Sequence, residues 1–315
     1  MIPIPATGPR ISVLGSVNMD LVSYVPTAPR LGETVMGREF REIPGGKGAN
    51  QAVAAARAGG DVELIGAVGD DAYGQRLRAG LDAAGVHIGG LRTVGARSGT
   101  AHIVVDDEGG NSIVVVPGAN AQMTQVSQEE ELRIAVSQLL LVQLELPLPG
   151  VLSGLRAARN RGVKTVLTPA PAPLEPLPQG LLDHVDLLVP NEHEARLMTG
   201  EDAPFLAAKA LLDLVPEVVI TLGSAGCLYL ARGSEPLEIP AFAVKACDTT
   251  GAGDTFVGAL AVALGEGQSI RSALIWASAA SAISVQRAGA SLSMPQRLEI
   301  ERMAGGVPRQ RPPVQ

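Results

Sequence analysis

A glycine-rich segment in the C-terminal third of the chain places an aspartate directly after residues with little or no side chain. It runs Asp248-Thr249-Thr250-Gly251-Ala252-Gly253-Asp254-Thr255-Phe256. We predict that it opens a helix, with Gly251, Ala252 and Gly253 leaving consecutive backbone N–H groups bare at the positive end of the helix dipole, where an anion binds well. Asp254 would then place a base beside this anion hole, which is the pairing that phosphoryl transfer to a hydroxyl requires.

Asp254 has a plainer explanation, because a carboxylate in the first turn of any helix stabilises the helix dipole. A purely structural cap, however, would not need the bare Gly-Ala-Gly backbone that precedes it. We therefore interpret Asp254 as a general base that accepts the proton of an attacking hydroxyl.

A second glycine-rich segment, Gly45-Gly46-Lys47-Gly48-Ala49-Asn50-Gln51, lies about two hundred residues earlier. It lacks the GxxxxGK[ST] spacing of a Walker A loop. A flexible turn into a helix over residues 49–58 would explain the glycines. It would not explain Lys47 and Asn50 on the opening turn, so we interpret these two side chains as ligand-binding.

Polar residues also follow two predicted strands. Asn18 and Asp20 come after the strand 11–14, and Glu145 ends the apolar run 139–144. The carboxyl ends of strands are where open α/β sheets bind ligands. The competing explanations are that Asn18 and Asp20 are turn residues and that Glu145 lies at a solvated strand end.

Six segments together resemble the ribokinase (PfkB) family of carbohydrate kinases, in the family's order and over almost the whole chain. They are Val13–Asp20, Gly45–Gln51, Gln143–Glu145, Asn191–Glu194, Thr221–Gly226 and Asp248–Phe256. The resemblance implies an ATP-dependent enzyme that phosphorylates a sugar, D-ribose at its O5 hydroxyl, with ribose 5-phosphate and ADP as products. It also implies Mg²⁺ and an activating K⁺ ion.

The resemblance assigns residues to each role. Catalysis falls to Asp254, Gly251, Ala252 and Gly253, and sugar binding to Asn18, Asp20, Gly46, Lys47, Asn50, Glu145 and Asp254. Nucleotide binding falls to Asn191, Thr221, Leu222, Gly223, Ser224, Ala225, Gly226, Gly253 and Ser278. Glu194 would hold Mg²⁺ through water, and the monovalent cation would lie at Asp248, Thr250, Ser284, Arg287, Gly289 and Ser293.

Two positions depart from the family pattern. Thr168 stands where many members have Asn before Pro-Ala-Pro, and Ser278 stands where His or Asn is common. Each change alters one expected contact of the nucleotide or metal without removing a chemical role.

The composition excludes several classes of protein. The net charge of −7 over 315 residues argues against a broad nucleic-acid or anionic-membrane surface. No apolar run reaches about 18 residues, and the first ten residues lack the apolar core of a secretory signal. Cys227 and Cys247 offer neither a disulfide framework nor a zinc site. We therefore expect a cytoplasmic protein with no nucleic-acid or membrane partner.

The order of the apolar runs predicts an α/β fold with a doubly wound, mostly parallel sheet flanked by helices. The predicted strands are 139–144, 163–167, 185–189 and 218–222, and the helices between and after them are 149–161, 192–199, 203–214, 253–264 and 270–286. Together they predict a single domain over residues 1–315, ending in a disordered tail over 304–315.

The early chain predicts a different element. The short runs 21–24, 34–43, 99–106 and 111–116, with a hairpin turn at 107–110, predict antiparallel strands outside the main sheet. The resemblance implies that these strands, drawn from about 20–45 and 97–117, form a lid over the sugar site. We also expect a homodimer that forms through this lid.

Other functions remain open at this point. A nucleoside kinase on the same fold would need aromatic surfaces to stack a base, and aromatic residues make up only 3% of the chain. Fructose or another sugar is a further alternative, as is a non-catalytic sugar-binding regulator, although such a regulator should have lost the base or the anion hole. A Rossmann dehydrogenase is excluded because Gly251-x-Gly253-x-x-Phe256 lacks the third glycine.

Overall fold

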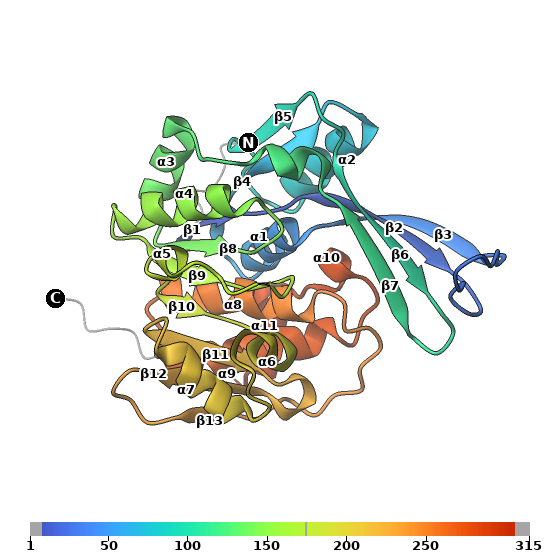
Figure 1. Cartoon of the computed structure of the whole chain (residues 1–315). Helices are drawn as coiled ribbons and strands as arrows, with labels where there is room; N and C mark the ends of the chain where they lie inside the picture. Colours follow the sequence, from blue (N-terminus) through green and yellow to red (C-terminus); the bar gives the residue numbers. More distant parts are fainter. Residues whose placement is uncertain (1–7, 174, 306–315) are drawn as a thin grey trace.

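The computed structural model describes residues 8–173 and 175–305, and the predicted tail lies outside them beyond Gly305. The described chain forms a large sheet between two layers of helices and a small sheet that projects from one side (Figure 1). The large sheet contains, in spatial order, β13 (Leu237–Ile239), β12 (Cys227–Ala231), β11 (Glu217–Thr221), β10 (Leu187–Leu188), β9 (Lys164–Leu167), β8 (Leu139–Val142), β1 (Arg10–Leu14), β4 (Asp61–Gly69) and β5 (Leu91–Val94).

The central strands are apolar on both faces, as strands covered by helices on both sides must be. In β1, Ile11 and Val13 pack into one hydrophobic cluster, whereas Leu14 packs into the other. β8 alternates in the same way. The pairings from β11 to β5 are all parallel, and only β12 runs antiparallel to its neighbours. The predicted doubly wound, mostly parallel α/β fold is confirmed.

Two sets of helices cover the two faces. The first cluster lies under α1 (Lys47–Arg57), α2 (Ala72–Ala83), α8 (Ala252–Gly265), α9 (Ile270–Ser284) and α11 (Arg297–Met303). The second lies under α3 (Gln128–Ala135), α4 (Leu148–Arg159), α5 (Gln179–Leu182), α6 (Glu192–Thr199) and α7 (Pro204–Leu212). Three short helical segments complete the described chain, namely η1 (Gly118–Gln122), η2 (Gly223–Ala225) and α10 (Ala290–Ser293).

The strand order reverses between β1 and β8. From β1 the chain adds β4 and β5 on one side, whereas β8 and the strands after it extend on the other side. Such a reversal leaves a crevice beyond the carboxyl ends of the two strands, and this crevice is the usual ligand site of an open α/β sheet. The topology therefore places residues 15–20 and 143–146 at the same edge.

The small sheet, which we call the lid, has the order β3-β2-β6-β7. Its strands are β3 (Glu39–Gly45), β2 (Asn18–Tyr24), β6 (Gly99–Val105) and β7 (Asn111–Val116). β2 pairs parallel to β6, whereas the other two pairings are antiparallel. The predicted hairpin turn joins β6 to β7, with Gly109 at a φ of 84°. The lid is tied to α2 by a hydrogen bond of 2.8 Å from Tyr73 to Glu42.

The predicted strand 139–144 ends two residues early, at Val142, and two other predicted strands are shortened more. The run 185–189 yields only β10, because the Asp186 side chain accepts the Thr165 N–H at 2.9 Å and Pro190 has no N–H to extend the ladder. The run 34–43 becomes a strand only from Glu39, since the preceding residues are mostly exposed and have little to pack against. None of the helices in the described ranges has the length and apolar character to cross a membrane.

Candidate active site

The first turn of α8 carries the predicted catalytic carboxylate. Gly251 is the N-cap and has a φ of 72°, a left-handed conformation that an L side chain would strain. The structure gives the N–H groups of Gly251 and Gly253 no acceptor among the described residues, so both remain open to an anion. The prediction of three bare N–H groups is wrong at Ala252, because a tight turn directs its N–H to the Thr249 carbonyl at 3.2 Å.

Asp254 is buried, with 9% of its surface exposed, and its two carboxylate oxygens each accept one side-chain hydrogen bond. Asn50 donates to Oδ2 at 3.0 Å and Gln51 donates to Oδ1 at 3.2 Å. Burial raises the pKa of Asp254, although Lys47, Asn50 and Gln51 each act to lower it. A buried carboxylate with a raised pKa is a stronger proton acceptor than an exposed one, which suits a general base.

The segment at the start of α1 turns sharply beneath the ends of β1 and β8. Gly46 has a φ of 92°, and a Cβ there would lie 2.8 Å from the Asn18 nitrogen, so only glycine fits. Glu145 Oε2 accepts the Lys47 N–H at 3.2 Å and the Ser16 hydroxyl at 2.5 Å. Glu145 is thus held at the switch point rather than left at a solvated strand end.

Lys47 is the cation at the centre of this site. Burial acts to lower its pKa, but the carboxylates of Asp254, Glu145, Glu194 and Asp20 raise it by more, and the net pKa is raised. A lysine with this environment stays protonated at neutral pH. The structure therefore brings four predicted site carboxylates, drawn from four separate parts of the chain, around one predicted site lysine.

Asn18 is fixed by a partner that sequence reasoning missed. The Asn120 side chain donates to Asn18 Oδ1 at 2.7 Å, and its own Oδ1 accepts the Val17 N–H at 3.0 Å. Both asparagines are buried, with exposed fractions of 2% or less. Because Asn18 Oδ1 already accepts, its amide nitrogen is the group left for a ligand.

Asp20 lies on β2 at the base of the lid. Burial and the nearby Glu145 raise its pKa to about 7, with a smaller opposite effect from Lys47. A carboxyl group with this pKa changes charge near neutral pH. Asp20 can therefore either accept or donate a hydrogen bond to a hydroxyl.

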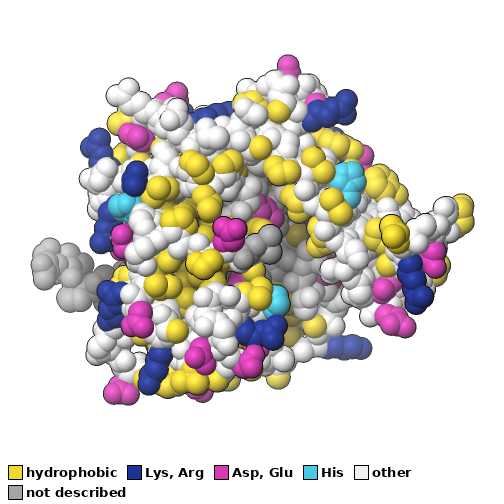
Figure 2. Space-filling view, in the orientation of Figure 1, with side chains coloured by type: hydrophobic (Ala, Val, Ile, Leu, Met, Phe, Trp, Pro, Cys, Tyr) yellow, Lys and Arg dark blue, Asp and Glu magenta, His cyan; other side chains and the backbone are white. Residues whose placement is uncertain are grey.

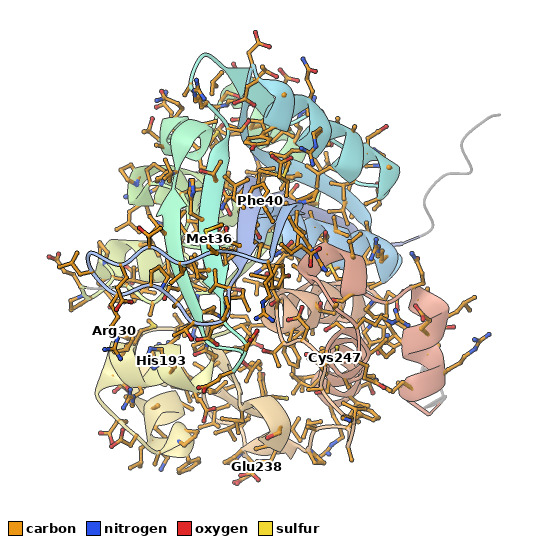
Figure 3. All side chains as sticks on the ribbon, turned by 90° about the vertical axis from the view of Figure 1, so that its right-hand side faces the viewer. Arg30, Met36, Phe40, His193, Glu238 and Cys247 are labelled. Carbon is orange, nitrogen blue, oxygen red and sulfur yellow. The ribbon has the colours of Figure 1, made fainter. Side chains whose placement is uncertain are left out.

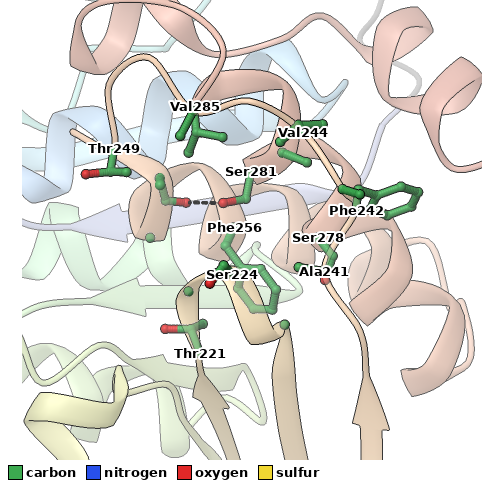
Figure 4. A pocket seen from close by; sticks show the side chains of 17 residues that line it. Thr221, Ser224, Ala241, Phe242, Val244, Thr249, Phe256, Ser278, Ser281 and Val285 are labelled. Atoms are coloured by element: carbon green, nitrogen blue, oxygen red, sulfur yellow. Dashed lines mark hydrogen bonds between the residues drawn. The ribbon is translucent and has the colours of Figure 1, made fainter.

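A cavity of about 420 Å³ lies on the other side of the first turn of α8 (Figure 4). Among the predicted nucleotide residues, Thr221, Gly223, Ser224, Gly226, Gly253 and Ser278 line it, whereas Asn191, Leu222 and Ala225 do not. Sequence reasoning missed residues 241–244 and Ala246, together with Phe256 and Val285, which also line it. Its walls are mainly small or apolar, so the cavity suits a flat, partly apolar ligand such as a nucleobase with its sugar.

Asn191 and Glu194 form a capping box at the start of α6. Asn191 Oδ1 accepts the Glu194 N–H at 2.7 Å, and Glu194 Oε2 accepts the Asn191 N–H at 2.9 Å. This structural role uses one oxygen of each side chain. Glu194 is also buried, and burial raises its pKa despite that hydrogen bond and the charge of Lys47.

The residues predicted for a monovalent cation lie in the loop before α8 and in the segment from the last residue of α9 to the end of α10. Asp248 accepts the Thr250 N–H at 2.9 Å and the Gly289 N–H at 2.8 Å, so it joins the two segments. Despite partial burial, these donors lower its pKa. The Arg287 side chain pairs with Glu299, so that only its backbone remains available.

Ser284 and Ser293 each donate their hydroxyl to a carbonyl three residues earlier. Their remaining acceptors are oxygens, the ligand type that hard cations prefer. Among residues 8–173 and 175–305, no three His, Cys, Asp or Glu side chains are grouped so that they could hold a metal ion. A cation at either predicted site would therefore need backbone, water or phosphate ligands.

Known proteins with similar sequences share this site's family. Residues 9–297 match the family model described as pfkB family carbohydrate kinase. The chain is 45% identical over 297 residues to the ribokinase of Bacillus subtilis, covering 93% of this chain and 99% of the relative. It is 39% identical over 307 residues to the ribokinase of Mus musculus, covering 92% and 93%.

A solved structure agrees with the sequence relatives. The structure of Arabidopsis thaliana ribokinase complexed with ribose and ATP superposes with a TM-score of 0.89 at 32% identity, covering 95% of this chain and 99% of that one. The matches span the glycine-rich segments, both sheets and the helices of the two layers. The chain belongs to the pfkB family of carbohydrate kinases.

Proposed function

We propose that this protein is a ribokinase that transfers the γ-phosphoryl group of ATP to the O5 hydroxyl of D-ribose, giving ribose 5-phosphate and ADP. The observation that carries the proposal is the position of Asp254. Its carboxylate faces the polar residues at the switch point, while Ala252 and Gly253 of the same helical turn line the nucleotide cavity. A base between two sites is what transfer from a nucleotide to a sugar hydroxyl requires.

Asp254 acts as the general base in this proposal. Asn50 and Gln51 occupy one direction on each carboxylate oxygen, which leaves the other directions free to accept the hydroxyl proton. The positive charge of Lys47 acts to lower the pKa of the carboxylate, against the effect of burial, and so favours its ionised form. The open N–H groups of Gly251 and Gly253 stabilise the charge that develops on the transferred group.

The sugar would be held by Asn18, Asp20, Gly46, Lys47, Asn50 and Glu145. Three features support this set: the Asn18 amide is left free by Asn120, Asn50 Oδ1 is buried without a partner among the described residues, and Asp20 can donate or accept. A buried, unpaired amide oxygen costs stability unless a ligand pairs it. A hydroxyl-rich ligand matches these groups better than a nucleoside, whose base would need an apolar slot.

The nucleotide would bind in the cavity of Figure 4, against Thr221, Ser224, Gly226 and Ser278. Asn191 lies beside this strand end, because it forms a bridge with Thr221. Leu222 and Ala225 would act only by shaping the turn before β12. The phosphates would lie at the end of the cavity that Gly253 lines, next to Asp254.

Mg²⁺ fits this site as a phosphate-bound ion. Mg²⁺ usually keeps several waters and uses one or two carboxylates with substrate phosphates, and Glu194 offers one oxygen that the capping box does not use. When bound, the ion neutralises charge on the phosphates. Glu194 would orient its water shell.

K⁺ fits the loop that Asp248 joins to the segment 284–293. An ion there would fix the loop that leads into Gly251 without touching the sugar. Activity should therefore fall when K⁺ is replaced by a bulky organic cation at equal ionic strength. An unchanged rate would mean that these residues only pack together.

A homodimer through the lid is the assembly that the surface favours. β7 pairs with β6 on one side, and its other edge has no strand partner among the described residues. Its residues Ile113, Val114, Val115 and Val116 expose between 45% and 64% of their surface, on both of its faces. Phe40 of the lid and Met36, in the segment before β3, are also exposed (Figure 3), and Figure 2 shows hydrophobic side chains over this region. Edge strands of monomers are normally short or charged.

The dimer has a direct test. A second copy would cover the same patch on each partner by two-fold symmetry. Val114→Lys should convert a dimer to a monomer in sedimentation or light scattering, whereas Leu298→Lys on exposed α11 should not. A monomeric wild-type protein would contradict the proposal.

The free thiols of Cys227 and Cys247 fit a reducing, cytoplasmic location, which fractionation would test.

The function itself is tested by a panel of sugars and nucleosides with ATP and Mg²⁺, scored by ADP release. D-Ribose should give the highest kcat/KM, and the product should carry its phosphate on O5. A preferred hexose or nucleoside would make the ribose assignment wrong while the kinase family remained. The protein would be a non-catalytic sugar binder if ribose bound and no substrate released ADP.

A further inference from the structure

The catalytic carboxylate is held by a chain of side-chain amides that reaches into the core of the sheet. Gln51 donates through Nε2 to Asp254 Oδ1 at 3.2 Å and to Thr168 Oγ1 at 3.3 Å. Gln143 donates through its own Nε2 to Gln51 Oε1 at 2.7 Å. Gln51 and Gln143 are both 0% exposed, so water cannot replace either hydrogen bond.

These residues come from four elements that meet only in the folded chain. Gln51 lies on α1, next to Asn50, and Asp254 lies on α8. Gln143 follows β8, and Thr168 follows β9. Through Gln51, the Asp254 carboxylate is therefore linked by hydrogen bonds to residues at the carboxyl ends of two central strands. These strand ends are among the most rigid parts of an α/β fold.

The direction of the Gln51 amide matters for the base. An amide can present either its NH₂ group or its oxygen to a neighbour. The oxygen would repel the Asp254 carboxylate, whereas the NH₂ group stabilises it. Because Gln143 donates to Gln51 Oε1, the oxygen is held away from Asp254 and the NH₂ group faces it.

Gln143 keeps this arrangement at a cost. Its own Oε1 is buried and has no hydrogen-bond partner among the described residues. A buried polar atom without a partner destabilises a fold unless it has a functional reason. Orienting Gln51 supplies such a reason, since Gln143 can donate to Gln51 only when its own oxygen points elsewhere.

We propose that Gln51 is a positioning residue for the catalytic carboxylate and that Gln143 fixes the direction in which the Gln51 amide points. The inference rests on the proposed function, in which Asp254 is the base. Neither glutamine touches substrate in this arrangement. Both act by holding Asp254 in the orientation in which its free directions face the sugar hydroxyl.

The other charges around Asp254 belong to the same environment. Lys47 lowers the pKa of Asp254, whereas Glu145 raises it, and Asp20 and Glu194 are coupled to it as well. Gln51 and Asn50 are the only hydrogen-bond donors to its carboxylate that the described residues supply. Removing Gln51 should thus raise the pKa of Asp254 further while leaving every charged group in place.

The main test compares Gln51→Met and Gln143→Met with the wild type in steady-state kinetics with ribose. Methionine keeps the length of the side chain and removes the amide. In Gln51→Met we expect kcat to fall about 10- to 100-fold, a loss typical of misplaced catalytic groups, while KM for ribose changes less than about threefold. The acidic limb of the kcat–pH profile should move to higher pH. Gln143→Met should show the same pattern with a smaller loss in kcat.

The matched control is Gln179→Met, which removes an exposed amide that donates to Asp183 Oδ1 at 3.0 Å at the end of α5, outside the site. It should leave kcat and the pH profile unchanged. A double variant supplies a second control, because residues that act as a unit are not additive. In an Asp254→Asn background, Gln51→Met should cause no further loss in kcat. A full additional loss there would show that Gln51 only supports the fold and would overturn the inference.

A readout that needs no turnover separates this inference from the proposed function. Carboxyl-labelled aspartate would report the pKa of Asp254 by NMR titration, with the signal assigned by its loss in Asp254→Asn. The pKa should rise in both glutamine variants, and Gln143→Met serves alone if Gln51→Met does not fold. An unchanged Asp254 pKa, or an unmoved acidic limb, would overturn the inference even if the protein phosphorylates ribose. Absence of ribose phosphorylation with the NMR shift present would instead overturn the proposed function.

Discussion

The sugar side and the nucleotide side of the site are built on different principles. On the sugar side, buried polar side chains such as Asn18, Asn50 and Asp254 are bound to one another and to the backbone before any ligand arrives. On the nucleotide side, a cavity of about 420 Å³ is lined mainly by small and apolar residues. One side is a preorganised hydrogen-bonding array, and the other is a shaped surface.

The difference indicates where selectivity lies. A site made of paired buried polar groups penalises any ligand that leaves one of them unpaired, often by a large factor. An apolar slot distinguishes ligands by their shape alone, and each contact in it contributes less binding free energy than a buried hydrogen bond. Substitutions on the sugar side should therefore have large effects on turnover and substrate choice. Those on the nucleotide side should have small effects, mainly on KM for ATP.

The largest effect should come from the residue between the two sides. Asp254→Asn keeps the size of the side chain and removes its ability to accept the hydroxyl proton. We expect kcat to fall by at least about 10²-fold, the usual contribution of a general base, with ribose binding nearly intact. Single-turnover kinetics and ribose titration by calorimetry would measure both quantities. Near-normal turnover would mean that Asp254 is not the base.

Substrate choice should show the next largest effect. D-Ribose should exceed adenosine in kcat/KM by at least about 10²-fold, equivalent to roughly 2.7 kcal/mol of transition-state binding. The reason is that the sugar side offers hydrogen-bonding groups, while the exposed Phe40 and the Arg41-stacked Tyr24 leave no aromatic slot for a base. Initial rates with each substrate at saturating ATP would give the two kcat/KM values. A preference for adenosine would invert the comparison between the two sides.

The sequence predicted the catalytic segment and the strand ends because both have local signatures. Glycines before a carboxylate mark a helix start with open N–H groups, and polar residues after apolar runs mark the crevice of an α/β sheet. The prediction failed at Ala252, where the geometry of one turn decides the partner of a single N–H. The sequence could not show such detail.

The supporting residues could not be predicted for another reason. Asn120 contacts Asn18 across 102 positions, and the contact depends on how the lid strands pair. Gln51 and Gln143 lie inside two of the segments that resemble the family, but neutral amides follow no spacing rule that signals their role beside Asp254. On the nucleotide side, Phe256 follows Asp254 closely, but the segment 241–246 has no glycine-rich signature to mark it. Only the folded arrangement identifies these residues.

Asp20 offers a test in which stability and function change in opposite directions. Its pKa is about 7 in the folded protein against an ordinary 3.8, so the folded state binds the proton more tightly than the unfolded state does. Asp20 therefore destabilises the protein progressively as pH rises from about 4 to 7, and the full penalty is present above pH 7.

Replacing Asp20 by Asn should remove that penalty. At pH 8 the variant should gain on the order of 1–3 kcal/mol in free energy of unfolding, and at pH 4 it should show little difference from the wild type. Its kcat/KM for ribose should fall about tenfold, since one acceptor for a hydroxyl is lost. Chemical denaturation at both pH values, with Asp106→Asn on the exposed lid turn as a control, would measure this. Equal stability changes at the two pH values would contradict the assignment of the penalty to Asp20.

The smallest effect is expected on the nucleotide side, from Ser278→Ala. Ser278 lines the cavity on α9, and its hydroxyl acts to lower the pKa of the buried Cys227 thiol, so it already interacts with a protein group. Removing one weak hydrogen bond among apolar contacts should change KM for ATP by less than about threefold, or roughly 0.6 kcal/mol, and leave kcat and KM for ribose unaltered. Ser278→Leu, which fills the cavity instead of trimming it, should raise KM for ATP far more while sparing ribose. Ser278→Ala could instead raise KM for ATP about tenfold, the factor by which Asp20→Asn should lower kcat/KM for ribose. In that case the nucleotide side would also bind its ligand mainly through hydrogen bonds. The contrast between the two sides would then be wrong.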